Sequence, residues 1–329
     1  MGTVLKSVVV VGGGAAGLAA AWRAASLGHS VTLLEANGRL GVKLRISGGG
    51  KCNVTHEGAP KALLAAFPTD QARFLRPAFH GFTSEDLREL LRQRGVETYV
   101  RENGRVFPLD LPGSAAAVVA AWEGLVREAG VVVRSQARAM DLVGDAPRVE
   151  AVVLESGQWV RGEQFILAVG GASYPETGTR GEWLGRLEKR GVAVRPWRPA
   201  LAPIPLERPR PQWSGVALRE GAMHLWEGRG GRRLGRFPGD LLFTSAGLSG
   251  PAALEGSEAT ETARRQGAAW LTYAFTELDE ASLDGELQRF QGAHPHTAAR
   301  TWLQRWMPER VAAAMVEEAS LAADQRMKD

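Results

Sequence analysis

A strand that leads at once into three spaced glycines and a helix restricts the fold of this chain more than any other stretch. The run Val8–Val11 predicts a buried strand, because a continuous series of β-branched residues is typical of strands covered on both faces. It ends in the pattern Gly12-x-Gly14-x-x-Gly17, and the alanine-rich stretch over 15–27 predicts a helix. This order predicts the start of a parallel α/β unit.

Each glycine of this pattern has its own mechanical role in a dinucleotide site. The first allows a tight turn, the second lets a pyrophosphate approach the backbone, and the third lets the helix pack against the strand. The helix N-terminus then offers N–H groups and a partial positive charge to the phosphates. The pattern therefore predicts a phosphate site at residues 12–17.

An acidic residue follows at the spacing of a ribose-binding group. Gly28 is suited to end the helix, and Ser30–Leu34 predicts a second strand that stops at Glu35. Glu35 lies 18 residues after Gly17, close to the spacing of about 20 expected of an acid that binds the ribose hydroxyls. The series predicts dinucleotide binding, and the motif alone leaves both NAD and FAD open because Glu35 permits both.

Length and cysteine content limit the class of protein. The chain has 329 residues, 44% of them hydrophobic, which is enough for two domains with buried cores. Its single cysteine, Cys52, excludes an intrachain disulfide and fits a reducing cytoplasm. Val8–Ala21 imitates a signal peptide or a membrane span, but its glycines and the nearby Arg23 favour strand, turn and helix. We therefore expect a cytoplasmic protein with no membrane partner.

The charge distribution does not favour a nucleic-acid partner. The net charge is +4, and arginine accounts for 34 of the 40 basic residues, a skew typical of genome composition. The densest basic clusters, Arg229–Arg236 and Arg264–Arg265, are short and form no long stripe. We therefore expect a small-molecule substrate rather than a nucleic acid, while the oligomeric state stays open.

A helical pattern, a glycine and a β-rich run recur along the first part of the chain. The glycines are Gly28, Gly95, Gly130 and Gly191. This alternation predicts an α/β fold with a largely parallel sheet, of the Rossmann type. Short strand-like runs over 137–160 then predict a β-meander lying on that sheet.

A change in composition predicts where the second domain begins. Six prolines fall within 193–213, which indicates a boundary between residues 1–192 and residues 193–329. The second part is expected to be β-rich over 213–275 and helical after that. Trp302 and Trp306 lie four residues apart in the helical part and favour core packing over an aromatic binding platform.

Six segments, in order, resemble the BaiN-like bacterial flavoproteins, a family of NAD(P)/FAD-dependent oxidoreductases. They are GGGAAGLAAA, LRISGGGKCNVT, GRVFP, LAVGGASYPETG, RPALAPIPL and GDLLFTSAGLSGPA, and they extend over essentially the whole chain. The resemblance implies a Rossmann-like FAD-binding domain with a second, mixed β/α domain inserted into it. It also implies an enzyme that passes hydride from NAD(P)H through FAD to a small unsaturated or carbonyl-conjugated substrate.

The resemblance also implies which residues contact FAD. They are Gly12, Gly14, Ala15, Ala16 and Gly17 at the pyrophosphate; Glu35 and Ala36 at the adenosine ribose; Lys43, Ser47, Gly48, Gly49, Gly50, Lys51 and Cys52 along the path to the flavin; Ala139 beside the adenine; and Val169, Gly170 and Gly171 under the phosphates.

The loop at residues 48–52 suits the electron-rich end of a flavin. Its glycines can turn backbone N–H groups toward an anionic ligand, and Lys51 adds positive charge nearby. A positive charge at the pyrimidine end favours the reduced flavin, so Lys51 is the candidate for flavin tuning, with a solvated loop lysine as the alternative. Cys52 favours a small buried thiol over a nucleophile.

Three departures from the family pattern bear on activity. Gly178–Trp183 replaces a GSTGDG-like turn, and Ser245 stands where the family has histidine. Family members continue into a C-terminal segment that returns to the Rossmann domain, and Asp329 lies about where that return would begin. The second hypothesis is therefore a catalytically silent homologue that binds FAD or a dinucleotide. A third, an RNA-associated flavoprotein, requires a contiguous basic face.

Other catalytic classes lack their motifs. Ser47 and Ser249 lie among glycines, but neither forms the G-x-S-x-G of a hydrolase. The six histidines show no metal-ligand spacing, so we expect no metal site. A second strand followed by GxGxxG is also absent, so NAD(P)H would dock transiently against the flavin.

Overall fold

Two units of the chain each fold around a core of their own. The computed structural model describes residues 4–109, 113–145, 148–267, 269–322, 324, 326 and 327. Contacts divide the chain into Met1–Trp197 and Arg198–Asp329. Within the described residues, no helix has both the length and the apolar character needed to cross a membrane.

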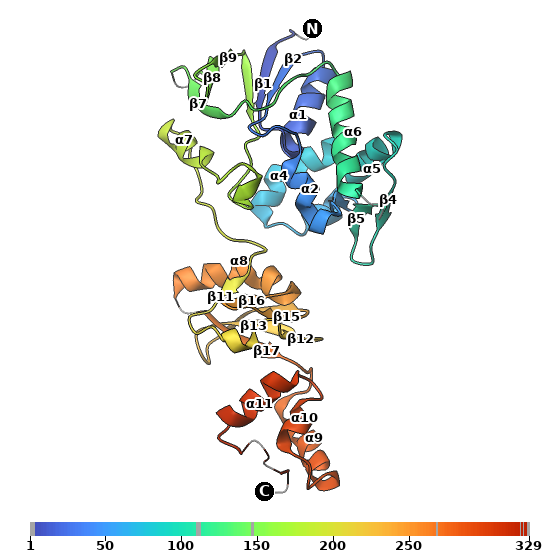
Figure 1. The fold of residues 1–329 in the computed structure, drawn as a ribbon, viewed down its shortest axis with the longest axis vertical. Coiled ribbons are helices and arrows are strands. Elements are labelled where there is room, and N and C mark those ends of the chain that lie inside the picture. Colours follow the sequence, from blue (N-terminus) through green and yellow to red (C-terminus); the bar gives the residue numbers. More distant parts are fainter. Residues whose placement is uncertain are drawn as a thin grey trace. The chain divides into compact units, whose positions relative to one another are not determined.

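A four-stranded parallel sheet forms the centre of the first unit (Figure 1). Its order is β10-β1-β2-β6, with β1 at Ser7–Val11, β2 at Ser30–Leu34, β6 at Val132–Arg134 and β10 at Gln164–Leu167. Val10 is paired with Leu33 on one side and Ile166 on the other, and all four valines of β1 are buried. The predicted α/β fold with a Rossmann-like parallel sheet is confirmed.

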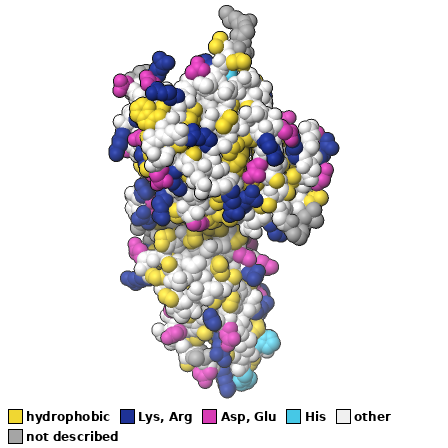
Figure 2. All heavy atoms as spheres, turned by 45° about the horizontal axis from the view of Figure 1, so that its top comes forward, with side chains coloured by type: hydrophobic (Ala, Val, Ile, Leu, Met, Phe, Trp, Pro, Cys, Tyr) yellow, Lys and Arg dark blue, Asp and Glu magenta, His cyan; other side chains and the backbone are white. Residues whose placement is uncertain are grey.

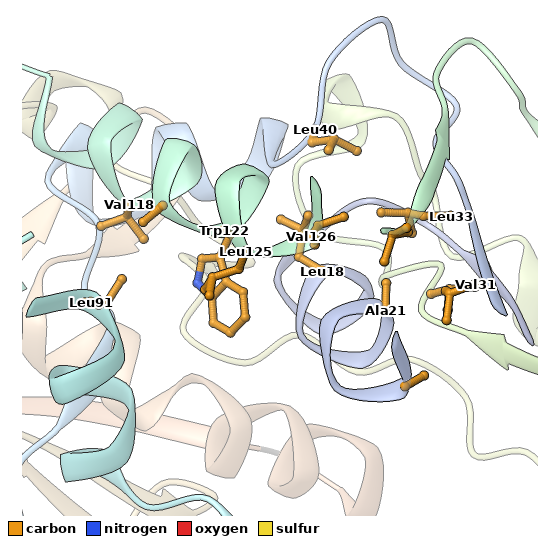
Figure 3. Close-up of a cluster of buried hydrophobic side chains, with 14 of the residues drawn as sticks. Leu18, Ala21, Val31, Leu33, Leu40, Leu91, Val118, Trp122, Leu125 and Val126 are labelled. Atoms are coloured by element: carbon orange, nitrogen blue, oxygen red, sulfur yellow. The ribbon is translucent and has the colours of Figure 1, made fainter. Parts of the chain in front are cut away.

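Two long helices cover one face of this sheet with apolar side chains. They are α1, Ala15–Ser26, and α6, Ser114–Glu128. Figure 3 shows Leu18 and Ala21 of α1 beside Val126 of α6, with Leu33 of β2 completing the cluster. The helix α5, Ser84–Gln93, begins with a reciprocal capping box and adds Leu91 to the same core.

The other face of the sheet packs against a β-meander. Its strands are β7 at Ala139–Val143, β8 at Ala151–Leu154 and β9 at Trp159–Arg161, paired antiparallel in that order. Val9 and Leu34 of the parallel sheet share a buried cluster with Val152 of the meander. The meander lies on the sheet as its sequence pattern predicts.

Two of the four recurring glycine units do not add strands to the parallel sheet. After Gly95, β4 at Thr98–Val100 joins a separate antiparallel sheet, β3-β5-β4, with β3 at Thr55–His56 and β5 at Arg105–Pro108. After Gly191, no strand forms within the described residues 192–203. Prolines in that stretch lack the N–H that a ladder requires, so the backbone stays irregular.

Further helices connect the larger elements of the first unit. They are α2 at Val42–Ile46, η1 at Ser47–Gly50, α3 at Pro60–Leu64, α4 at Thr69–Gly81, η2 at Pro175–Thr177 and α7 at Trp183–Lys189.

The second unit places a helix against two small antiparallel sheets. The sheets are β11-β16-β15-β12 and β14-β13-β17. Their elements are β11 at Ile204–Pro205, β12 at Ala217–Leu218, β13 at Ala222–Glu227, β14 at Arg233–Pro238, β15 at Leu241–Phe243, β16 at Gly247–Ser249 and β17 at Ala269–Ala274. The helices are η3 at Pro211–Trp213, α8 at Pro251–Gln266, α9 at Glu280–Ala293, α10 at Ala299–Leu303 and α11 at Glu309–Glu318.

The core of this unit joins both sheets to the helices. Met223, Leu241 and Ala252 share one buried cluster with Val311 of α11. Trp302 is buried and meets Trp306 edge to face, with ring centroids 4.6 Å apart. The pair packs within the helical part, as the spacing of the two tryptophans predicts.

Removing side-chain volume from the central strand is expected to weaken the first unit. Leu33 is fully buried, so Leu33→Ala should lower the free energy of unfolding by about 2–5 kcal/mol through reduced burial and a residual cavity. Leu27, which is 51% exposed, provides the matched control, and Leu27→Ala should change stability by about 0.5 kcal/mol or less. Urea denaturation followed by circular dichroism measures both. Equal losses of stability in the two variants would contradict the described core.

Candidate functional site

A cavity of about 490 Å³ lies where the strands of the parallel sheet end. Val11 and Leu34 bring the carboxyl ends of β1 and β2 to its wall, and Ala168 follows β10 on the same edge. Ligands of open parallel sheets bind at this edge. The volume falls within the range of about 300–1,000 Å³ typical of cofactor and ligand sites.

The three predicted glycines differ in what surrounds them. A Cβ on Gly12, whose φ is +104°, would lie 2.4 Å from the carbonyl oxygen of Ala168. A Cβ on Gly17 would lie 1.7 Å from the carbonyl oxygen of Gly12, so α1 can start this close to the turn only without a side chain there. A Cβ on Gly14 would meet no atom within 4 Å, and Gly14 lines the cavity. The second glycine therefore leaves room for a ligand against the backbone.

The N-terminus of α1 supplies the anion-binding group beside this opening. Gly14 caps the 12-residue helix without a side-chain hydrogen bond, and the first turn contains no acidic residue. The first N–H groups of a helix have no carbonyl partner one turn back, and they carry the positive end of the helix dipole. Ala15 and Ala16 line the cavity, so this positive end faces its interior and suits an anionic ligand.

Glu35 connects the glycine turn to the opposite wall. Its carboxylate is buried and accepts three hydrogen bonds of 2.7 Å, from the backbone N–H of Gly13, the backbone N–H of Asn37 and the side-chain amide of Asn37. A carboxylate accepts about four hydrogen bonds, so one acceptor position remains for a hydroxyl donor. The Asn37 amide also donates to the carbonyl of Thr177 at 3.2 Å and so holds the η2 segment in place.

The wall opposite the glycines comes from residues that the sequence patterns did not identify. Arg138 donates to the carbonyl oxygen of Gly178 at 3.1 Å, which ties the meander to the turn after η2. Trp183 is buried at the start of α7. The lining missed by the sequence analysis comprises Val11, Leu34, Asn37, Val42, Leu44, Ala137, Arg138, Leu167, Ala168, Thr177, Gly178, Thr179, Glu182 and Trp183.

The cavity brings together most of the predicted site residues. Those that line it are Gly12, Gly14, Ala15, Ala16, Glu35, Ala36, Lys43, Ser47, Ala139, Val169 and Gly170. Lys43 donates from Nζ to the carbonyl oxygen of Ser173 at 2.6 Å, which fixes the loop after Gly171 across the cavity. The lining does not include Gly17, Gly48, Gly49, Gly50, Lys51, Cys52 and Gly171.

The glycine loop continues from the cavity wall at Ser47. Gly48 and Gly49 adopt left-handed backbone angles within η1, with φ of 57° and 68°. The backbone N–H of Cys52 donates to the carbonyl of Ser47 at 2.9 Å and closes the loop. Lys51 is exposed, whereas Cys52 is fully buried in the core, and burial raises the pKa of its thiol.

Cys52 is expected to be unreactive in the folded protein. Burial blocks access to the sulfur, and the raised pKa lowers the thiolate fraction at about pH 8. Iodoacetamide should therefore modify Cys52 slowly in the native protein and rapidly in denaturant, as measured by mass spectrometry. Rapid modification of the native protein would favour a nucleophilic role instead.

The glycines allow cofactor binding to be separated from folding. Gly14 has a φ of −81°, so Gly14→Ala should leave the Tm nearly unchanged while its methyl group occupies the phosphate opening. We expect its affinity for FAD to fall by about tenfold or more, equivalent to about 1.4 kcal/mol, in a fluorescence titration. Gly17→Ala should instead lower the Tm, because its methyl group overlaps the Gly12 carbonyl. Unchanged FAD affinity in Gly14→Ala would place the phosphates elsewhere.

Two curated proteins are similar to nearly the whole chain. The ribosomal RNA dihydrouridine synthase of Haemophilus influenzae is 27% identical over 320 residues, which cover 94% of this chain and 74% of that protein. The protein of the same name from Escherichia coli is 26% identical over 307 residues, covering 92% and 71%. Among solved structures, a 3-ketosteroid-delta4-(5alpha)-dehydrogenase from Rhodococcus jostii RHA1 is 17% identical with a TM-score of 0.46, covering 68% of this chain and 60% of that one.

A family model accounts for most of the chain. The model of the HI0933-like protein Rossmann domain matches residues 6–282, which include the parallel sheet, the cavity and much of the second unit. This match supports FAD as the cofactor and flavin-dependent oxidoreduction as the general activity. The chain belongs to the HI0933-like Rossmann-domain family.

Proposed function

We propose that this chain is a FAD-dependent reductase that takes hydride from NAD(P)H and adds it, together with a proton from water, to a carbon–carbon double bond conjugated to a carbonyl. We further propose that this double bond belongs to a uracil base of a ribosomal RNA. The curated relatives, named ribosomal RNA dihydrouridine synthases, match over 94% and 92% of the chain and support this choice. The observation that carries the cofactor assignment is the open space at Gly14 against the N-terminus of α1.

Uracil fits the substrate chemistry that the sequence analysis expects. Its 5,6 double bond is conjugated to the carbonyl at position 4, so reduction of that bond is reduction of a carbonyl-conjugated alkene. The expected small unsaturated molecule and a uracil base in RNA therefore present the same reacting group. The two substrates differ in the rest of the molecule, which is a free small molecule in one case and an RNA chain in the other. An experiment must therefore compare the two as acceptors.

The residues of the cavity have distinct roles in this proposal. The N-terminus of α1 and the Gly14 opening hold the pyrophosphate, and the remaining acceptor position of Glu35 takes a ribose hydroxyl. Lys43 fixes the loop that contains Ser173 through a hydrogen bond. Ser47 lies in the cavity wall, at the residue where the glycine loop 48–50 begins. When bound, FAD supplies the hydride transfer, and Lys51 remains the candidate that tunes it.

The proposal predicts a flavin that NAD(P)H reduces and a product found in RNA. We expect the purified protein to show a flavin spectrum that bleaches on anaerobic addition of NADH or NADPH. With unmodified ribosomal RNA as acceptor, dihydrouridine should accumulate, as measured by mass spectrometry of the digested nucleosides. Gly14→Ala should form product only in proportion to the FAD that it retains.

Three other results would contradict parts of the proposal. A protein that cannot be reconstituted with FAD would overturn it entirely. A flavin that is bound but never reduced would favour the catalytically silent binding homologue. Reduction of free uridine monophosphate, with ribosomal RNA untouched, would favour a small-molecule substrate.

A further inference from the structure

One face of a small sheet in the second unit combines an exposed tryptophan, Trp270, and a half-buried one, Trp226, with arginines. On the face of the molecule drawn in Figure 2, basic side chains are interspersed with acidic ones. The local grouping of charges, rather than their total, therefore decides where a polyanion could bind. The densest basic cluster in the sequence, at residues 229–236, includes the tip of the β13–β14 hairpin and the first part of β14.

The sheet β14-β13-β17 has one covered face and one open face. Met223 and Phe237 point to the covered face, because a Cβ added to Gly256 of α8 would meet their side chains at 2.4 and 2.8 Å. Side chains alternate along a strand, so His224 and Trp226 of β13 point the opposite way. Trp226 is paired directly with Trp270 of β17, and Trp270 is 44% exposed.

The two indoles are held in defined positions on this open face. Trp226 donates from Nε1 to Oγ1 of Thr272 at 2.9 Å. The ring of His224 meets Trp226 edge to face, with centroids 6.1 Å apart. The guanidinium of Arg229 lies 5.5 Å from the ring centroid of Trp270. A rigid aromatic surface loses little conformational freedom when a flat ligand stacks on it.

The charges around the indoles are predominantly positive. Four arginines and two glutamates lie in this region, so its net charge is +2. They are Arg229, Arg232, Arg233 and Arg236, and Glu227 and Glu277. Arg232 is paired with Glu227 at 3.8 Å, and Arg236 is paired with Glu277. Burial lowers the pKa of His224, and the charges of Arg233 and Arg236 lower it further, so its imidazole is neutral near neutral pH. The arginines therefore supply the positive charge of this face.

We propose that this arginine–tryptophan face (His224, Trp226, Arg229, Arg233, Arg236 and Trp270) binds a single-stranded segment of RNA. Bases would stack on the indole of Trp270, and the exposed guanidinium groups of Arg229 and Arg233 would contact phosphates. The choice of RNA over another polyanion rests on the proposed function. Stacking and phosphate contact tolerate any base sequence, so the face would hold the strand and leave base selection to another part of the enzyme.

The test separates stacking from charge by measuring how RNA affinity depends on salt. The probe is a fluorescein-labelled oligouridine of about 12 nucleotides, titrated with the FAD-loaded protein and followed by anisotropy. Trp270→Ala should weaken binding by about tenfold without changing the slope of log K against log salt, and Trp270→Phe should recover part of the affinity. Arg229→Ala combined with Arg233→Ala should reduce the slope by about 0.7 for each phosphate that the protein no longer neutralises.

A matched pair of residues in the first unit provides the control. Trp159 of β9 is 51% exposed and has the guanidinium of Arg161 5.6 Å from its ring centroid, but it lacks a second tryptophan across the strand. Trp159→Ala and Arg161→Ala should leave RNA affinity and salt slope unchanged. All variants should retain the Tm, the FAD content and the rate of flavin reduction by NAD(P)H.

The outcomes distinguish this inference from the proposed function. If wild type forms dihydrouridine while the Trp270 and arginine variants bind RNA as wild type does, the face is not the RNA site. If wild type binds RNA through this face but forms no dihydrouridine, the proposed function fails and the inference stands. Equal binding of poly-glutamate, unaffected by Trp270→Ala, would indicate an acidic protein partner and overturn it. The inference would also be overturned if the wild-type protein formed a dimer that Trp270→Ala dissociates, because a second copy of the chain would then occupy the face.

Discussion

The contact between residue 17 and the carbonyl of Gly12 controls the geometry of the first unit. With no side chain at Gly17, α1 begins directly above the turn that ends β1. That closeness places the N-terminus of α1 at the edge of the sheet and leaves the space over Gly14 open. Helix packing therefore depends on the missing side chain at position 17, and the open space against the backbone depends on the missing side chain at position 14. A methyl group at position 17 disturbs the first, and a methyl group at position 14 disturbs the second.

Glu35 shows how a residue can belong to both the scaffold and the site. Three of its hydrogen bonds are internal, and they connect the glycine turn, the residue after β2 and, through Asn37, the segment at Thr177. The carboxylate is therefore already oriented before a ligand arrives. Such preorganisation removes an ordering cost from the binding of any ligand that donates to this carboxylate, because the acceptor does not have to be immobilised at that moment.

Local signals made part of this site predictable from sequence. Val8–Val11, the glycine pattern and Glu35 lie within one short stretch, and strand, helix and turn there form as their residues indicate. The wall that includes Arg138 and Trp183 joins segments that are distant in sequence, and no residue pattern specifies their pairing. For the same reason, the pattern after Gly95 predicts the strand at 98–100 but does not predict that this strand pairs with β5 outside the parallel sheet. Composition marked the basic cluster at 229–236, but only the pairing of strands in the sheet shows that its arginines lie beside Trp226 and Trp270.

The pairing of β1 with β10 has a consequence for how the protein is made. Ser7 at the start of β1 is hydrogen-bonded to Glu163, 156 residues later in the chain. During synthesis the first strand can pair with β2 early, but its other edge must wait until β10 has left the ribosome. Ala168, Val169 and Gly170 follow β10, and the cavity lining extends to Trp183, so the cavity is completed only after β10 has emerged. Until β10 emerges, the nascent chain therefore has an exposed strand edge at β1 that is open to mispairing.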